Sequence, residues 1–234
     1  MPKANGQRST VNDTKMILLI DTAQETGSVT LAKEGAIIFS EENKIAKEHA
    51  GWLHPAIGRV LENAKSTVRD LEAVAVMAGP GSYTGLRVGM AAAKGFCYAL
   101  KIPLITQITL RVMAESMQSQ AEENGAWICP LIDARRDEVF TALYDSNMRE
   151  LMPPQAMILD KSAFETRLAQ NPTVFFGSGA EKLEKVITSP AARFKTQPDI
   201  KQAFASLSQQ DFSFGKWADL VYSEPVYLKE FFSY

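Results

Sequence analysis

The amino-acid sequence predicts an α/β fold made of two similar halves, and three observations support this. An apolar run at residues 16–21 and alternating segments at 27–33 and 36–44 are separated by short polar turns, which predicts an antiparallel meander. From residue 53 onward, helical and strand patterns alternate, as is typical of parallel strands connected through helices. The same order of elements returns in a weaker form after residue 126.

The first half continues from the meander through three helical patterns. One apolar helix face is predicted from the spacing of Leu53, Ile57, Val60, Leu61 and Ala64. After it come a strand at 73–78, a glycine-containing helix at 85–100, a strand at 103–107 and a helix at 110–123.

The second half begins with two strands on either side of the polar turn DARRDE, residues 133–138. Further strands are predicted at 153–160 and 173–177, and amphipathic helices at 161–170 and 180–187. The aromatic tail is predicted to pack back onto the body of the protein. No repeat is visible in the residues themselves, so an internal duplication depends on the order of elements alone.

Composition and charge restrict the class of protein. The chain is 46% hydrophobic and 22% charged with a formal net charge of -2, which excludes broad disorder and a strongly basic nucleic-acid surface. No apolar run approaches the roughly 20 residues needed to cross a bilayer, so no membrane association is expected. Residues 1–15 have no apolar signal core and predict a polar, disordered leader on a cytoplasmic protein. Cys97 and Cys129 lie in apolar surroundings and are predicted to be buried free thiols.

The glycine-rich stretch at residues 77–89 (MAGPGSYTGLRVG) follows a buried strand and opens a helix. It lacks the Gly-Lys-Ser/Thr ending of a P-loop, the third glycine of a dinucleotide fingerprint and the flanking glycines of a nucleophile elbow around Ser82. One interpretation is an anion site, in which backbone N–H groups at a helix N-terminus act together with Arg87. Its candidate residues, including an acid at the end of the first strand, are Asp21, Gly81, Ser82, Tyr83, Thr84 and Arg87.

The other interpretation is close packing of backbones. Small residues recur every four positions on two faces of the helix, which allows a neighbouring backbone to approach each face. One face can pack on the sheet, whereas the other has no obvious partner within the chain. The two stripes are Gly85, Gly89 and Ala93, and Ala91, Gly95 and Ala99.

The residues that could carry catalysis or bind a metal form no complete set. His49 and His54 are five residues apart, which on a helix separates them by roughly 140° and prevents shared ligation. With two histidines in the chain, a serine triad around Ser82 lacks a base. Asp21 and Asp133 each end a predicted strand, so paired carboxylates of a phosphotransferase remain an alternative to ordinary turn chemistry.

Five segments, in this order and at these separations, resemble the TsaB family, also called YeaZ: LLIDTAQETGSVTL, HAGWLHPAI, GPGSYTGLRVGMAAAKGF, PLIDARRDEVFTALY and EPVYLKE. The resemblance implies the fold shared by acetate kinase, hexokinase, Hsp70 and actin (the ASKHA fold). In that fold, residues 16–109 form an N-terminal ribonuclease-H-like lobe and residues 110–234 an abbreviated second lobe. One departure is Ala50, where the family usually has serine after histidine, and it weakens any ligand role of that segment.

The resemblance also implies a function without catalysis. TsaB pairs with its paralogue TsaD, the transferase with a metal-binding H-x-x-x-H motif, and with the ATPase TsaE. Together they make threonylcarbamoyladenosine at adenosine 37 of tRNAs that read codons beginning with A. No catalytic residue, metal or cofactor of its own is then expected, whereas ATP or ADP with Mg is expected at most at the boundary between subunits.

Contacts implied by the family are a TsaD pairing, a homodimer of the isolated chain, and tRNA contact only indirectly through the complex. The alternative is a nucleotide-dependent phosphotransferase or a peptidase-like enzyme of the same superfamily. The expected interface lies on the first-lobe helices and comprises Leu53, Ile57, Val60, Leu61, Gly85, Gly89, Met90, Ala91, Ala93 and Gly95.

Overall fold

The computed structural model describes residues 15–45, 48–122 and 125–229. The predicted leader therefore lies outside the described residues, apart from its last position. Across the described part of the chain, no helix combines the length and the apolar character that a membrane span requires.

The first sheet has five strands in the order β3-β2-β1-β4-β5. Strands β1 (Met16–Asp21), β2 (Gly27–Lys33) and β3 (Ala36–Asn43) pair antiparallel, as the short turns between them require. Strands β4 (Leu71–Gly79) and β5 (Leu104–Ile108) run parallel to β1 and are reached through helices. The predicted meander and the parallel addition to it are both confirmed.

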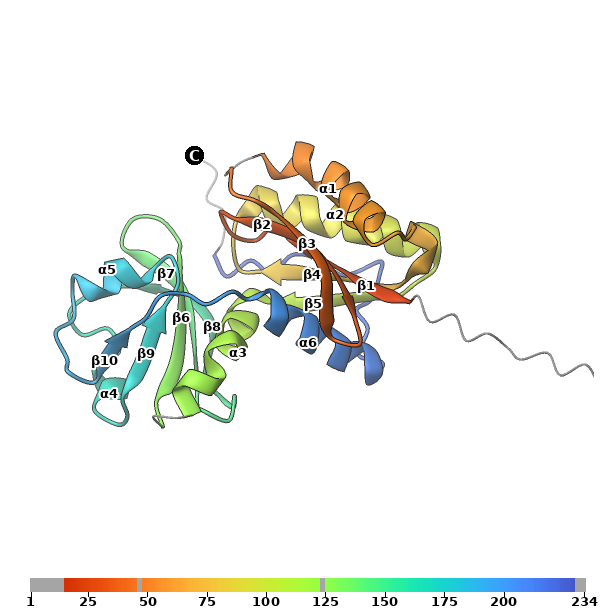
Figure 1. The fold of residues 1–234 in the computed structure, drawn as a ribbon. Coiled ribbons are helices and arrows are strands. Elements are labelled where there is room, and N and C mark those ends of the chain that lie inside the picture. Colours follow the sequence, from red (N-terminus) through yellow and green to blue (C-terminus); the bar gives the residue numbers. More distant parts are fainter. Residues whose placement is uncertain (1–14, 46–47, 123–124, 230–234) are drawn as a thin grey trace, which may run out of the picture.

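Two pairs of helices cover the two faces of this sheet (Figure 1). Helices α1 (His49–Asn63) and α2 (Tyr83–Leu100) lie together on one face, where alternate residues of β1 such as Leu18 and Ile20 point. Helices α3 (Thr109–Glu122) and α6 (Lys201–Ser213) lie on the other face, over Ile17 and Leu19. Because strand side chains alternate between faces, the continuous apolar run of β1 serves both layers.

The second sheet repeats the topology of the first, in the order β8-β7-β6-β9-β10. Its strands are β6 (Trp127–Asp133), β7 (Glu138–Tyr144), β8 (Glu150–Ile158), β9 (Thr173–Phe176) and β10 (Ala192–Phe194). Strands β6, β7 and β8 form an antiparallel meander, and β9 and β10 add in parallel. The duplication expected from element order is therefore present in the structure.

The second lobe is abbreviated in its helices. The helix predicted at residues 161–170 is the single turn α4 (Glu165–Leu168), and the one predicted at 180–187 is α5 (Ala180–Glu184). A short 3-10 helix, Val68–Asp70, precedes β4 in the first lobe.

Helix α6 connects the second half back to the first. It follows β10, yet it packs against β5, β3, β1 and α3, so this part of the predicted second lobe belongs spatially to the first sheet. Helix α3 also packs against β6, and its residues Val112, Met113 and Met117 share one core cluster with side chains of both sheets. The two lobes are thus joined through a common apolar layer, and the division of the chain at residues 109 and 110 stays a prediction.

Candidate functional site

The glycine-rich loop connects β4 to α2 and lies against the carboxyl end of β1. The Ser82 N–H donates to the Ala23 carbonyl at 2.7 Å. A Cβ on Gly81 would lie 2.1 Å from the same oxygen, so only glycine allows the loop to approach β1 this closely. The Ser82 hydroxyl then caps α2 by accepting the Gly85 N–H at 3.3 Å.

One small-residue stripe of α2 packs directly on Thr22, which follows β1. A Cβ on Gly85 would lie 1.9 Å from the Thr22 carbonyl oxygen, and one on Gly89 would lie 2.4 Å from the Thr22 Oγ1. The Thr22 hydroxyl donates to the Gly85 carbonyl at 2.7 Å. The close-packing interpretation is therefore confirmed for the stripe of Gly85, Gly89 and Ala93, which is buried.

The predicted anion cradle is partly satisfied by the chain itself. The N–H groups of Ser82 and Gly85 already have acceptors within the loop region. The Arg87 guanidinium turns outward, lies over the Tyr83 ring at 4.3 Å and donates from Nε to the Tyr227 hydroxyl at 3.2 Å. Anion or nucleotide binding at this loop stays a prediction.

Asp21 lies at the carboxyl end of β1 and is 3% exposed. Burial raises its pKa to about 6, although its carboxylate accepts the Ala23 N–H at 2.9 Å. The bond to Ala23 shapes the turn after β1, so the structure gives Asp21 a local structural role.

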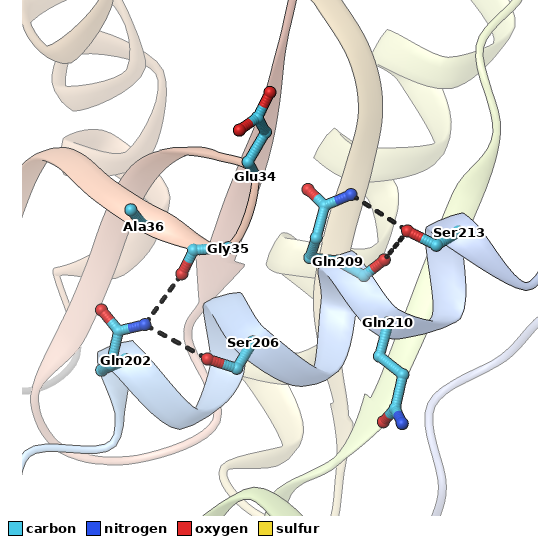
Figure 2. Close-up of a pocket in the computed structure, with 8 residues that line it drawn as sticks. All are labelled: Glu34, Gly35, Ala36, Gln202, Ser206, Gln209, Gln210 and Ser213. Atoms are coloured by element: carbon cyan, nitrogen blue, oxygen red, sulfur yellow. Dashed lines mark hydrogen bonds between the residues drawn. The ribbon is translucent and has the colours of Figure 1, made fainter.

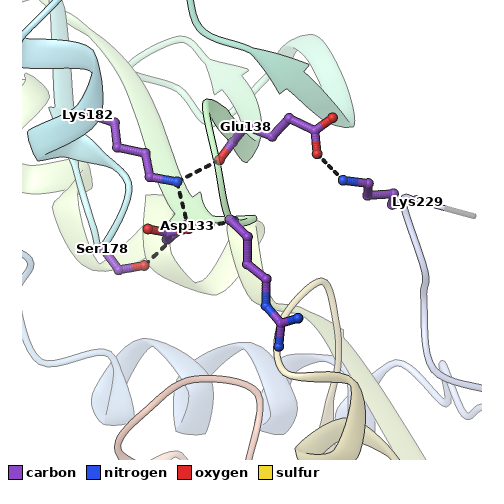
Figure 3. Close-up of polar contacts among 6 residues, drawn as sticks. Asp133, Glu138, Ser178, Lys182 and Lys229 are labelled. Carbon is purple, nitrogen blue, oxygen red and sulfur yellow. Dashed lines mark hydrogen bonds and ion pairs between the residues drawn. The ribbon is translucent and has the colours of Figure 1, made fainter. Parts of the chain in front are cut away.

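Asp133 occupies the equivalent place at the end of β6, and Figure 3 shows its partners. Its carboxylate pairs with Lys182 at 2.7 Å and accepts the Arg135 N–H at 2.6 Å. Partial burial opposes the charge, but Lys182 and the backbone donor outweigh it and lower the pKa. Asp21 and Asp133 are therefore each engaged within their own lobe.

Substituting Asp21 with asparagine tests the buried carboxyl group. Between its ordinary pKa of 3.8 and its folded pKa of about 6, the native protein binds more protons than the unfolded chain, so its stability falls as the pH rises through this window. Asp21→Asn keeps an oxygen acceptor for Ala23 but cannot ionise. We therefore compare the unfolding free energies of Asp21→Asn and wild type. As the pH rises from 4 to 7, we expect this difference to change by about 2–3 kcal/mol in favour of the variant.

Urea denaturation of both proteins at several pH values measures this difference. All other titrating groups are common to the two proteins and cancel in the comparison. A difference that stays constant between pH 4 and pH 7 would contradict the prediction.

The second stripe of α2 faces solvent. Ala91, Gly95 and Ala99 are exposed, and no atom would lie within 4 Å of a Cβ on Gly95. Tyr98 beside them is 80% exposed. Lys94 donates to the backbone carbonyls of residues 221 and 223, which brings the C-terminal segment against this helix with Val221 and Tyr222 73% and 82% exposed.

A shallow groove of about 310 Å³ lies where α2 meets the C-terminal segment. Its lining combines charged and apolar groups: Arg87, Met90, Ala91, Lys94, Ser223, Glu224, Pro225 and Tyr227. Exposed apolar patches with a polar rim mark surfaces that bind other proteins.

Most of the predicted interface residues lie in the protein's own core, which corrects that part of the prediction. Burial in the first lobe removes most of these side chains from the surface, because they fill the layer between α1, α2 and the sheet. Met90 is also buried, but it reaches the floor of the groove on α2. Ala91 and Gly95 are the members of the predicted set that are exposed. The buried members are Leu53, Ile57, Val60, Leu61, Gly85, Gly89, Met90 and Ala93.

Gly95→Ala tests whether the outer stripe is free of contacts within the chain. Glycine in a helix interior costs about 1 kcal/mol relative to alanine, and a methyl group at this position meets no neighbour. We expect Gly95→Ala to raise the unfolding free energy by about 0.5–1 kcal/mol, measured by urea denaturation. A loss of stability would show that the outer face is already packed.

The two histidines have separate surroundings. His49 is buried, with Nε2 3.1 Å from the Gln24 carbonyl and Nδ1 3.4 Å from the Asn43 side-chain nitrogen. The His54 ring lies 6.1 Å from that of Phe96. In the described residues, no three histidine, cysteine or acidic side chains gather as metal ligands. Cys97 and Cys129 are buried free thiols, as predicted.

A second groove, of about 520 Å³, lies between the β2–β3 turn and α6 (Figure 2). Gln202 donates to the Gly35 carbonyl at 2.8 Å and to the Ser206 hydroxyl at 3.2 Å. Glu34 is the one charged residue in its lining, and the other polar groups are neutral amides and hydroxyls. The hydrogen bond from Gln202 to Gly35 attaches α6 to the β2–β3 turn of the first lobe.

Comparison with known proteins identifies the family. A family model described as TsaD: tRNA N6-adenosine threonylcarbamoyltransferase matches residues 38–222. The tRNA threonylcarbamoyladenosine biosynthesis protein TsaB of Bacillus subtilis is 30% identical over 164 residues, which cover 69% of this chain and 70% of that protein. The chain belongs to the TsaB family.

Two further relatives agree with TsaB membership. TsaB of Escherichia coli is 36% identical over 129 residues, covering 55% of this chain and 54% of that protein. The structure of YeaZ from Pseudomonas aeruginosa superposes with a TM-score of 0.76 at 25% identity, over 92% of this chain and all of that one. Together with the duplicated sheets, these similarities confirm the predicted ASKHA fold with an abbreviated second lobe.

The sequence did not predict that the C-terminal segment contributes to the surface around α2. Tyr227 contacts Tyr83 and Arg87, and Lys229 pairs with Glu138 of the second lobe. The only signal was the aromatic composition of the tail, which predicted packing onto the body but not its position.

Proposed function

We propose that this chain is the non-catalytic subunit that activates a TsaD-type transferase in the threonylcarbamoylation of adenosine 37 in tRNA. The observation that carries the proposal is the outer stripe of α2, which is exposed, small and bordered by Tyr98 and Tyr222. Small residues let a helix of another subunit approach closely, and the exposed aromatic groups supply apolar area at the edge.

The glycine loop supports a positioning role. Its glycines let α2 rest against the end of β1, and its capping serine is committed to Gly85. Asp21 and Asp133 hold turns within separate lobes. These contacts favour a scaffold over a phosphotransferase, because several of the groups that would bind a phosphate already have partners within the chain.

The proposed partners are those that the family resemblance implies. We infer a TsaD-type subunit on the α2 stripe, a TsaE-type ATPase joining the pair in the cytoplasm, and a second copy of this chain on the stripe when it is isolated. Two copies related by a twofold axis would cover each other's stripe. ATP or ADP with Mg would bind at the boundary of the subunits.

Reconstitution tests the function. The purified chain is combined with TsaD- and TsaE-type proteins of the same organism, a threonylcarbamoyl donor, ATP, Mg²⁺ and unmodified tRNA, and modified adenosine is measured by mass spectrometry. We expect modification only when all three proteins are present. Sustained ATP hydrolysis by the chain alone that is lost in Asp21→Ala would instead identify a phosphotransferase-like enzyme.

A further inference from the structure

The turn between β6 and β7 holds two consecutive arginines in an unfavourable backbone conformation. Arg135 has φ 70° and Arg136 has φ 49°, in the left-handed region that favours glycine. Seven non-glycine residues of the described chain have positive φ, and these are the only two that are adjacent. Asparagine and glycine adopt this region at the least cost, so arginine at both positions points to a need for the side chains.

Both arginine side chains are exposed, and neither guanidinium group makes a hydrogen bond or ion pair with the described residues. Two carboxylates of the turn are paired with lysines, Asp133 with Lys182 and Glu138 with Lys229 (Figure 3). The exposed Asp137 forms no ion pair with either arginine in the described residues. Strained backbone positions cluster at functional sites, and here two of them are adjacent. The turn therefore presents two positive charges to a ligand outside the chain.

The C-terminal segment connects this turn to the N-terminus of α2. Lys229 pairs with Glu138 beside the turn, and Tyr227, two residues earlier, contacts Tyr83 and Arg87. Arg87 is exposed, as are the two arginines of the turn. Cationic groups and aromatic rings thus follow one another from the first lobe to the second.

We propose that the arginine turn, together with Arg87, contacts the phosphate backbone of the tRNA directly. The identity of the RNA rests on the proposed function, but the proposal goes beyond the expectation that tRNA contact is only indirect. Guanidinium groups on both lobes suit a ligand with several phosphates in succession. The rings of Tyr83 and Tyr227 lie beside Arg87, and sites that stack unpaired bases of a single strand likewise combine aromatic rings with cations.

The experiment uses the variant Arg135→Asn/Arg136→Gly, which removes both charges and supplies residues suited to positive φ. Fluorescence polarisation with a labelled, unmodified tRNA transcript measures affinity at several salt concentrations, for the full chain and for its complex with a TsaD-type subunit. We expect at least tenfold weaker binding to the tRNA. The slope of log K against log salt concentration should become shallower by about 1.4, which corresponds to the loss of two phosphate contacts. The variant should also melt at a higher temperature, because the backbone strain is relieved.

The matched control is Lys65→Gly/Arg69→Asn, which also removes two exposed positive charges and relieves the positive φ of Lys65 at 53°. We expect the control to bind RNA within about twofold of wild type, since a nonspecific effect of net charge is weak across the screened surface. Equal affinity of the turn variant and the control would overturn the proposal. Loss of TsaD-type subunit binding with unchanged RNA affinity would also overturn it, in favour of a protein contact.

The readout is RNA affinity, and formation of modified adenosine is measured separately. A turn variant that binds tRNA normally disproves this inference while leaving the subunit function intact. A wild-type chain that fails to support modification disproves the proposed function, whatever its affinity for RNA.

Discussion

Gly85→Ala will destabilise the protein by about 3 kcal/mol, even though alanine is the better helix former. The new methyl group would lie 1.9 Å from the Thr22 carbonyl oxygen, which is backbone and cannot rotate away. Helix α2 must then move off β1, which weakens the bond from the Thr22 hydroxyl to the Gly85 carbonyl. Urea or thermal denaturation of the purified variant measures the loss.

Gly95→Ala is the matched control for this result. It makes the same substitution in the same helix, but on the exposed face, where the structure leaves room for the methyl group. Opposite signs of the two effects would show that α2 is held through its inner stripe. If Gly85→Ala were as stable as wild type, the close approach of α2 to Thr22 would be wrong.

Ala91→Arg and Gly95→Leu will each weaken pairing with a TsaD-type subunit by at least about 2 kcal/mol, roughly 30-fold in Kd. Either side chain separates the backbones that small residues allow to touch, while the inner stripe and the core remain unchanged. Ala91→Arg also adds a positive charge to a groove that already contains Arg87 and Lys94. Isothermal titration calorimetry measures the affinity, and light scattering measures self-association.

The control for this pair is Ser119→Arg, a comparable substitution at an exposed position of α3. All three variants should melt cooperatively, and Ser119→Arg should bind the partner like wild type. Folded Ala91→Arg and Gly95→Leu proteins that pair with wild-type affinity would place the interface on another face of the molecule.

The parts of the fold predicted from sequence are those with strong local patterns. The meander and α2 have clear periodicity and turn residues, so they appeared at nearly the observed bounds. Strand β10 has three residues and α6 has a largely polar sequence, so neither shows a pattern before its packing partners are known. Helix α6 is stabilised by contacts with α3 and β5 that are distant in sequence.

The sequence predicted those parts of the candidate site that depend on the size of the side chains. The spacing of glycine and alanine indicated two close-packing stripes, and the structure buries one and exposes the other. The apolar residues of α1 could not be assigned to core or interface from periodicity, because both require the same pattern. Likewise, the strain at Arg135 and Arg136 is a backbone property that no residue pattern reveals.

The path of the C-terminal segment has a consequence for the timing of folding during synthesis. The Ala218 N–H donates to the Leu104 carbonyl at 2.8 Å, and the Val226 N–H donates to the Ala78 carbonyl at 2.7 Å. Leu104 on the edge strand β5 and Ala78 at the end of β4 are therefore paired by residues that are synthesised more than a hundred positions later. Until residue 218 has been made, Leu104 at the β5 edge presents an open hydrogen-bonding group to other nascent chains, so this edge of the first lobe is completed late in synthesis.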